Sequence, residues 1–245
     1  MGDSWITYRC WAHHILGEHE SELAAARKAI ASHPEWEWVR EDEIAALAAL
    51  GRVDEAIEAA ERCLVDPEIA GQAGYIVIDG AAELRAHGHR EASLVLANRV
   101  VSWCEMRPDS TQASAEETGL HVEALRYAER WREAAQLLRP VVVDGTDNPR
   151  VIGVLGGFAG RLGDREGAIE ASESLRRLDD RHLFGWHTYR RACIAAVLGE
   201  REDAVALLRQ AFAEGLEYGQ YLHIEIDLET LWDYPPFQEL MEPKG

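Results

Sequence analysis

The chain has 245 residues, 47% of them hydrophobic, and its 25 Lys and Arg against 44 Asp and Glu give a formal net charge of −19. An acidic surface of this size repels phosphate backbones and anionic lipid, so neither a nucleic-acid nor a membrane partner is expected. No apolar run approaches the roughly 18 residues of a membrane-spanning helix, and no signal peptide is predicted. The four cysteines lie far apart in helical patterns. This spacing predicts free thiols in a reducing cytoplasm, with disulfide pairing between helices as the alternative.

Helical patterns follow one another in pairs along the chain. In the best-defined pair, residues 38–50 and 54–65, apolar side chains recur at helical spacing on both sides of Gly51. Glycine enters the left-handed conformation that closes a helix more easily than other residues, so Gly51 predicts a tight turn. A pair this short cannot bury its apolar face alone, which predicts that it stacks on further copies.

Five further pairs supply those copies. The breaks between paired helices fall, in chain order, at Gly17, Gly51, Gly88, Glu129, Gly163 and Gly199, at intervals of 34, 37, 41, 34 and 36 residues. The predicted repeats are residues 4–34, 36–67, 74–108, 113–143, 149–179 and 185–215. The fourth repeat is degenerate, because its break lacks glycine and Pro140 truncates or kinks its second helix. No domain boundary is visible, so residues 1–245 are expected to form a single domain.

The period and the pattern of small residues resemble the tetratricopeptide repeat, a helix-turn-helix unit of about 34 residues. The residues that carry the resemblance are the five turn glycines and small residues at recurring slots, such as Cys10, Ala81, Gly156, Ala192, Ala56, Ala168 and Ala204. Ile44 and Val122 depart from the small-residue slot of the first helix. The resemblance implies an all-α, right-handed superhelical solenoid of about six repeats. It also implies a non-enzymatic cytoplasmic scaffold or adaptor that binds a protein or peptide and needs no cofactor.

Residues 216–245 lie beyond the last repeat and are aromatic and irregular. The last helix of a solenoid leaves an apolar face exposed, so Trp232, Tyr234 and Phe237 are predicted to cover it as a C-terminal cap. The alternative is a docking peptide for another protein. This end of the chain also resembles the C-terminal repeat region of large bacterial proteins that carry a kinase, adenylate cyclase or winged-helix module. That resemblance gives an alternative function, a ligand-sensing or regulatory region of a bacterial signalling protein.

No catalytic or metal-binding motif emerges from the sequence. The histidines cluster at two turns without an HExxH motif or paired Cys and His spacing, which favours structural or surface roles for His13, His14, His19, His87 and His89. Acidic pairs at helix starts and in loops are interpreted as solvated faces. The glycines at 153, 157 and 160 share one helical face. Either a neighbouring helix packs closely there, or a ligand approaches bare backbone.

The remaining candidate site is the concave face that the family forms from its first helices. Carried over residue by residue, its lining is Trp11, His14, Trp38, Glu41, Tyr75, Arg85, Glu123, Arg126, Tyr127, Arg150, Arg161, Trp186 and Tyr189. Aromatic residues and arginine dominate binding hot spots. Arg85, Arg126 and Arg161 occupy similar repeat positions, which predicts one channel that engages an acidic or C-terminal carboxylate group of a partner. Alternatively, the aromatic residues belong to the core and the arginines are solvated.

Overall fold

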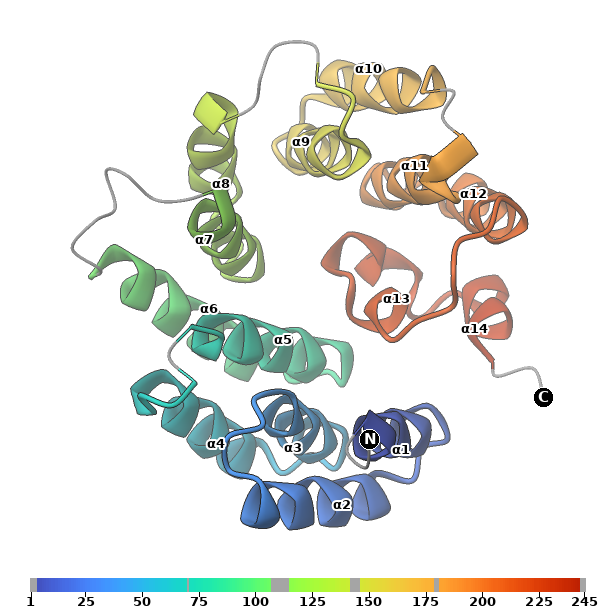
Figure 1. Cartoon of the computed structure of the whole chain (residues 1–245). Coiled ribbons are helices and arrows are strands. Elements are labelled where there is room, and N and C mark those ends of the chain that lie inside the picture. Colours follow the sequence, from blue (N-terminus) through green and yellow to red (C-terminus); the bar gives the residue numbers. More distant parts are fainter. Residues whose placement is uncertain (1–3, 70, 107–114, 142–145, 179–180, 243–245) are drawn as a thin grey trace. The chain divides into compact units, whose positions relative to one another are not determined.

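The computed structural model describes residues 4–69, 71–106, 115–141, 146–178 and 181–242 (Figure 1). Every regular element in these ranges is a helix, which confirms the predicted all-α helical repeat fold. The chain divides into two compact units, Met1–Arg130 and Trp131–Gly245, each with its own internal packing. The single domain predicted over residues 1–245 stays a prediction.

The first unit is built from antiparallel helix pairs. Its helices are α1 (Ser4–Ile15), α2 (His19–Ser32), α3 (Trp38–Ala49), α4 (Val53–Val65), α5 (Ala73–Ala86), α6 (Arg90–Glu105) and α7 (Ala115–Tyr127). Within each pair the two helices pack on one another, and the first helices α1, α3, α5 and α7 also pack in succession. This succession is the stacking that short amphipathic pairs require.

The second unit continues the pattern and ends in a tail of short helices. Its elements are α8 (Trp131–Leu138), the 3-10 turn η2 (Arg139–Val141), α9 (Pro149–Arg161), α10 (Arg165–Arg176), η3 (Arg181–Leu183), α11 (Trp186–Val197), α12 (Arg201–Ala213), α13 (Tyr221–Ile224), η4 (Ile226–Leu231) and α14 (Pro235–Met241). Helix α8 ends two residues before Pro140, which lies in η2. Proline lacks the backbone N–H that another helical turn would use, so it truncates this helix as predicted.

The turns between paired helices share one backbone geometry. Gly17, Gly51, Gly88, Gly163 and Gly199 all have φ between 69° and 85°. In the second pair the N–H of Arg52 donates to the carbonyl of Leu47 at 2.9 Å, which closes α3 with a Schellman motif. The degenerate fourth repeat keeps this geometry without glycine, because Glu129 adopts φ 58° and Arg130 donates to Leu125 at 2.9 Å.

Glycines compensate for bulky residues where first helices approach closely. A Cβ added at Gly80 of α5 would lie 2.6 Å from Cγ2 of Ile44 on α3. Ile44 occupies a position where the repeat family has a small residue, and Gly80 in the next repeat leaves the space that its side chain needs. In α9, a Cβ at Gly153 or Gly160 would lie 2.6 Å or 2.8 Å from side-chain atoms of α11, and one at Gly157 would lie 3.0 Å from Oδ2 of Asp227 in η4. Of the two alternatives for this glycine-rich stretch, the structure shows close helix packing.

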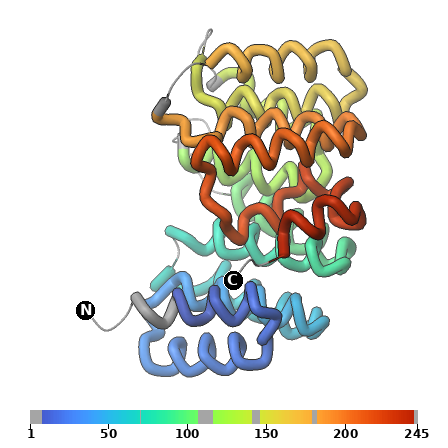
Figure 2. Tube along the Cα trace, turned by 90° about the vertical axis from the view of Figure 1, so that its right-hand side faces the viewer, coloured from blue at the N-terminus to red at the C-terminus, as the bar shows by residue number. Residues whose placement is uncertain are grey.

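The tail folds back on the last helix pair (Figure 2). Its apolar side chains share one buried cluster with α11 and α12, to which the tail contributes Leu216, Leu222, Leu228, Leu231, Phe237 and Met241. Trp232 and Tyr234 pack at the edge of this cluster. The hydroxyl of Thr230 also donates to the carbonyl of Ala196 on α11 at 2.8 Å. The tail therefore covers the apolar face that the last pair would otherwise expose, as a cap does.

Candidate functional site

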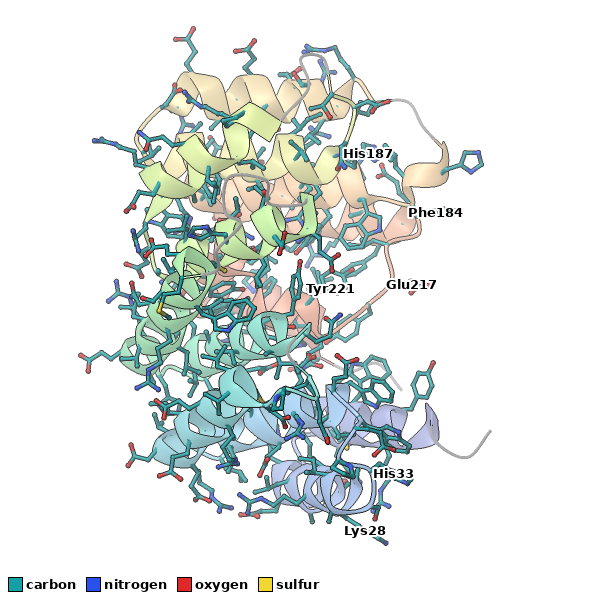
Figure 3. All side chains as sticks on the ribbon, turned by 60° about the vertical axis from the view of Figure 1, so that its left-hand side comes forward. Lys28, His33, Phe184, His187, Glu217 and Tyr221 are labelled. Carbon is teal, nitrogen blue, oxygen red and sulfur yellow. The ribbon has the colours of Figure 1, made fainter. Side chains whose placement is uncertain are left out.

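Two predicted lining residues of the first unit present large aromatic surfaces to solvent. Trp11 on α1 is 38% exposed and Trp38 at the start of α3 is 43% exposed. The Trp38 ring stacks on Trp36 at 5.8 Å between centroids, and Trp36 stacks on His33 at 3.9 Å. Figure 3 labels His33 beside the ribbon of this unit. The stack restricts the indole of Trp38 before any partner arrives.

Other predicted lining residues of the first unit are engaged within it. Buried Arg85 donates to a carboxylate oxygen of Glu129 at 2.8 Å. Buried Arg126 donates to Glu123, which lies one turn earlier on α7, at 2.6 Å. The Tyr75 hydroxyl donates to the backbone carbonyl of residue 116 at 2.9 Å, and Tyr127 is buried.

In the second unit, Arg161 holds the tail against α9. Its guanidinium donates to Asp227 at 3.1 Å and to the Ile226 carbonyl at 2.6 Å, and it lies 4.2 Å from the ring centroid of Trp131. Asp227 is buried, so this contact satisfies a charge inside the tail. An arginine predicted to bind a partner's carboxylate thus binds one from its own chain.

The aromatic residues of α11 form a second ring cluster with the tail. Tyr189 is fully buried, whereas Trp186 is 40% exposed. The Trp186 ring stacks on Tyr221 of α13 at 5.4 Å and meets Tyr189 edge-on at 5.5 Å. Arg150, the other predicted lining residue of this unit, is exposed in the first turn of α9. Figure 3 labels Tyr221 and exposed Phe184 in this unit.

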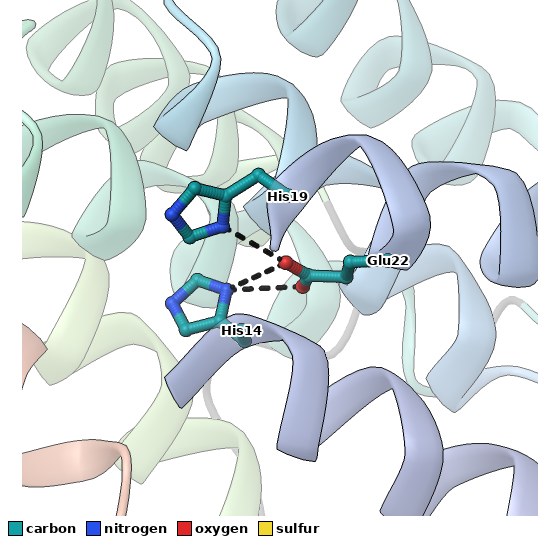
Figure 4. Close-up of side chains that lie close together, drawn as sticks. All are labelled: His14, His19 and Glu22. Carbon is teal, nitrogen blue, oxygen red and sulfur yellow. Dashed lines mark hydrogen bonds and ion pairs between the residues drawn. The ribbon is translucent and has the colours of Figure 1, made fainter. Parts of the chain in front are cut away.

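The first unit also assembles a histidine and carboxylate cluster that the sequence motifs did not predict. His14 at the end of α1 and His19 at the start of α2 both direct Nδ1 toward the carboxylate of Glu22, at 3.0 Å and 3.1 Å (Figure 4). On the other side of the His14 ring, Nε2 lies 3.6 Å from an oxygen of Glu83 on α5. Nε2 of His87 lies 3.6 Å from the same oxygen. Three imidazoles and two carboxylates thus converge from α1, α2 and the end of α5.

Electrostatics in this cluster are strongly perturbed. Burial and the charge of Glu83 raise the pKa of Glu41 to about 7. Burial, with repulsion from Glu41 and Glu22, raises the pKa of Asp42 to about 8. Burial opposes protonation of His14, but its hydrogen bond to Glu22 and the charge of Glu83 outweigh this effect and raise its pKa. The site therefore favours cations and bound protons.

Only part of this cluster could be predicted from the sequence. His14 and Glu41 were among the predicted lining residues, and the structure brings both into it. The signal for the rest is the spacing of Glu83 and His87, which lie four residues apart and so share one helical face. That spacing is common, and only the stacking of the first three repeats brings His14 to it.

Two sets in the described part of the first unit have a donor arrangement suited to a metal ion. The ligand atoms of His14, Glu83 and His87 lie within 4.8 Å of one another, as do those of His14, His19 and Glu22. Imidazole nitrogen and carboxylate oxygen are common ligands of divalent transition metals. The four cysteines, by contrast, are free thiols distributed over both units.

Among the helices that the structure describes, none combines the length and apolar character needed to cross a bilayer. A comparison with curated proteins finds no significant match. The family model described as "Tetratrico peptide repeat" matches residues 185–230. These residues cover α11, α12, α13 and most of η4, so the match includes the last repeat and part of the tail.

A solved structure provides the comparison over the whole fold. It is a tetratricopeptide repeat protein from Parabacteroides merdae ATCC 43184, which aligns with a TM-score of 0.52 and 11% identity. The alignment covers 93% of this chain and 84% of that protein. At this identity the likeness concerns the fold, while the family model supplies the link in sequence. This chain therefore has the fold of a tetratricopeptide repeat protein, and its residues 185–230 match the model of that family in sequence.

Proposed function

We propose that this chain is a non-enzymatic scaffold that binds a protein or peptide segment through exposed aromatic residues on its first helices. The observation that carries the proposal is the pair Trp11 and Trp38, which expose 38% and 43% of their surface on α1 and α3. These two helices pack directly on one another. Large indole surfaces on adjacent repeats are what an extended or helical peptide would bury, and tryptophan is among the residues most enriched in hot spots.

The stacking around Trp38 adds to this argument. An indole already restricted by Trp36 and His33 has less rotational freedom to lose when a partner binds. Ordering a side chain at an interface costs about 0.5–1.5 kcal/mol, so a preordered ring retains more of its contact energy. The structure thus supports Trp38 as a preorganised anchor.

The arginines are a second, finer part of the proposal. A carboxylate of the partner would compete with Glu129 for Arg85, with Glu123 for Arg126 and with Asp227 for Arg161. Exchange of one carboxylate for another conserves the ion pair, and it is easiest at Arg85 and Arg126, because Glu129 and Glu123 are only partly buried and can turn to solvent. At Arg161 the exchange would leave buried Asp227 unpaired, so this arginine is the least available of the three. Screening also limits repulsion from distant acids, because the Debye length is about 8 Å at physiological salt.

Selection from a random peptide library displayed on phage tests the proposal for a partner of any sequence. Peptides that bind the full chain are synthesised, and their affinities for variants are measured by fluorescence anisotropy. Removal of a hot-spot indole costs about 2 kcal/mol or more, so Trp38→Ala and Trp11→Ala should weaken binding by roughly 30-fold. Val65→Ala, at another exposed apolar position, should leave the affinity unchanged.

The same peptides test the arginines. If some selected peptides contain acidic residues or require a free C-terminus, Arg126→Ala should lower the affinity for those peptides and not for the others. Wild-type affinity in Arg85→Ala, Arg126→Ala and Arg161→Ala would remove the carboxylate contact from the proposal. Wild-type affinity in both tryptophan variants would contradict the proposed binding surface as a whole.

A further inference from the structure

In the histidine and carboxylate cluster of the first unit, two imidazoles approach one carboxylate oxygen. Nε2 of His14 and Nε2 of His87 both lie 3.6 Å from the same Oε2 of Glu83. This separation is longer than an ordinary hydrogen bond between nitrogen and oxygen. It is close to the separation of two ligand atoms on one tetrahedral ion, about 3.4 Å for bonds of roughly 2.1 Å.

We propose that His14, Glu83 and His87 bind one divalent transition-metal ion of the Zn²⁺ class. Two imidazole nitrogens and one carboxylate oxygen form a borderline donor set that suits Zn²⁺, whereas Mg²⁺ and Ca²⁺ prefer oxygen ligands alone. The ring centroids of His14 and His87 are 6.0 Å apart with planes at 76°. Two imidazoles can therefore point at a common ion without stacking on each other.

The surroundings of His14 prepare it to act as a ligand through Nε2. Glu22, which is only 1% exposed, accepts a hydrogen bond from Nδ1 of His14 at 3.0 Å. A histidine that donates Nδ1–H to a carboxylate presents the lone pair of Nε2 on its opposite side, and metal-binding histidines are commonly oriented in this way. Glu22 is therefore assigned as the positioning residue.

His19 reinforces this arrangement from the second helix. Its Nδ1 shares the same Glu22 carboxylate at 3.1 Å, and its ring centroid lies 5.8 Å from that of His87. His19 is a candidate nitrogen donor for the fourth position of a tetrahedral ion, and water is the alternative occupant. In both cases the three principal ligands remain His14, Glu83 and His87.

Charge supports a cation at this place. Glu83 is 2% exposed and Glu22 is 1% exposed. Burial, with repulsion from charges that include Glu83 and Glu22, also raises the pKa of the neighbouring acids Glu41 and Asp42, as expected where further negative charge is poorly tolerated. Several carboxylates withdrawn from water repel one another and lose hydration, which is costly unless positive charge compensates. A divalent ion compensates two of these charges at once.

The ligands also indicate what the ion would do. His14 belongs to the first repeat, while Glu83 and His87 belong to the third, so the ion would link helices that are separated by a full repeat. A metal bound only in the folded state stabilises that state. The assigned role is therefore structural, a link that fixes the first repeat to those that follow.

The experiment uses the full chain after treatment with EDTA and its removal. Zn²⁺ is added in competition with a chromophoric chelator, and Co²⁺ is added separately so that its visible absorption reports coordination. We expect one equivalent of bound metal and the intense absorption of tetrahedral Co²⁺. His87→Ala and Glu83→Gln should weaken binding by more than about 100-fold, and Glu22→Gln by about 10–100-fold, the range for outer-shell partners of a ligand.

His89→Ala is the matched control, because His89 follows the same turn glycine but belongs to neither metal-binding set. Circular dichroism of each variant confirms that it folds, and His87 is exposed, so its removal leaves the core intact. Absence of a stoichiometric site in the wild type would overturn the proposal. A loss in His89→Ala equal to that in His87→Ala would also overturn it. If His19→Ala abolishes binding while His87→Ala does not, the set is His14, His19 and Glu22, and the proposed ligands are wrong.

Discussion

The first repeats and the C-terminal tail show two different ways of completing a helical repeat array. In the second unit the tail buries Leu222, Leu228 and Leu231 completely against α11 and α12. In the first unit, the interior beside α1 contains the buried carboxylates of Glu22 and Glu83 together with partly buried histidines. Terminal repeats need a partner for their exposed face. The first repeat also buries apolar residues such as Leu23 and Ala26, so the comparison shows that its interior differs from the tail by the titratable groups placed beside that core.

The largest effect is expected in the apolar tail. Leu228 is fully buried, and truncation of a buried leucine to alanine costs about 2–5 kcal/mol. Leu228→Ala should therefore lower the free energy of unfolding by that amount, measured by urea denaturation with circular dichroism. Val65→Ala, at a highly exposed position on α4, should change it by less than about 0.5 kcal/mol. Equal stability of the two variants would show that the tail does not act as a cap.

Deletion of residues 231–245 extends the same test. The last helix pair should then expose its apolar face, and the chain should lose stability and self-associate, as light scattering would detect. A truncated chain that stays monomeric and equally stable while it loses a peptide ligand would favour the docking-peptide alternative.

Removal of metal from the histidine and carboxylate cluster should lower the stability of the chain by a comparable amount. An ion at 100 times its dissociation constant stabilises the folded state by about 2.7 kcal/mol. For a chain of this size, that corresponds to a rise in Tm of roughly 5–10 °C. EDTA should reverse the rise in the wild type and have no effect on His87→Ala. Leu228→Ala should keep the Zn²⁺-dependent rise, because its defect lies in the second unit.

The pH dependence of stability tests the same cluster through the buried acid Asp42 on α3. Its pKa is raised from 3.8 to about 8, so the folded state holds a proton that the unfolded state releases at lower pH. Wild-type stability should therefore fall as pH rises from about 4 to about 8 and level off above that range. Asp42→Asn should reduce this slope, with the remainder contributed by Glu41, whose pKa is also raised. It should gain about 1–3 kcal/mol at pH 8, the cost of a poorly compensated buried polar group. Measurements in EDTA separate this effect from metal binding, and an unchanged slope would contradict it.

Much of the fold was accessible from the sequence, because it depends on local signals. Gly51 and Gly163 mark left-handed turns that few other residues adopt, and Pro140 marks a helix end. The histidine and carboxylate cluster was not accessible in this way. Its members come from the first and third repeats, and their approach depends on how α1, α3 and α5 stack, which no local pattern specifies. Arg161 was identified as a candidate ligand-binding residue, but its contact with Asp227 depends on how the tail folds back.

The smallest effect is expected at the turn of the fourth repeat, where a local signal, the missing glycine, and long-range contacts, the ion pairs of Glu129, act on the same residue. Glu129 takes the left-handed conformation at φ 58°, where a residue other than glycine costs roughly 1–2 kcal/mol, while its carboxylate accepts hydrogen bonds from Arg85 and Arg90. Glu129→Ala removes these pairs and keeps the strain, whereas Glu129→Gly removes the pairs and relieves it. The free energy of unfolding of Glu129→Gly, measured by urea denaturation, should therefore exceed that of Glu129→Ala by about 1 kcal/mol.

Gly163 provides the matched control, because a Cβ added there meets no other atom and no ion pair changes. Gly163→Ala should lower the free energy of unfolding by about 1 kcal/mol, the conformational cost of a left-handed residue other than glycine. If Glu129→Ala is as stable as Glu129→Gly while Gly163→Ala is destabilised, the fourth turn does not hold a strained residue.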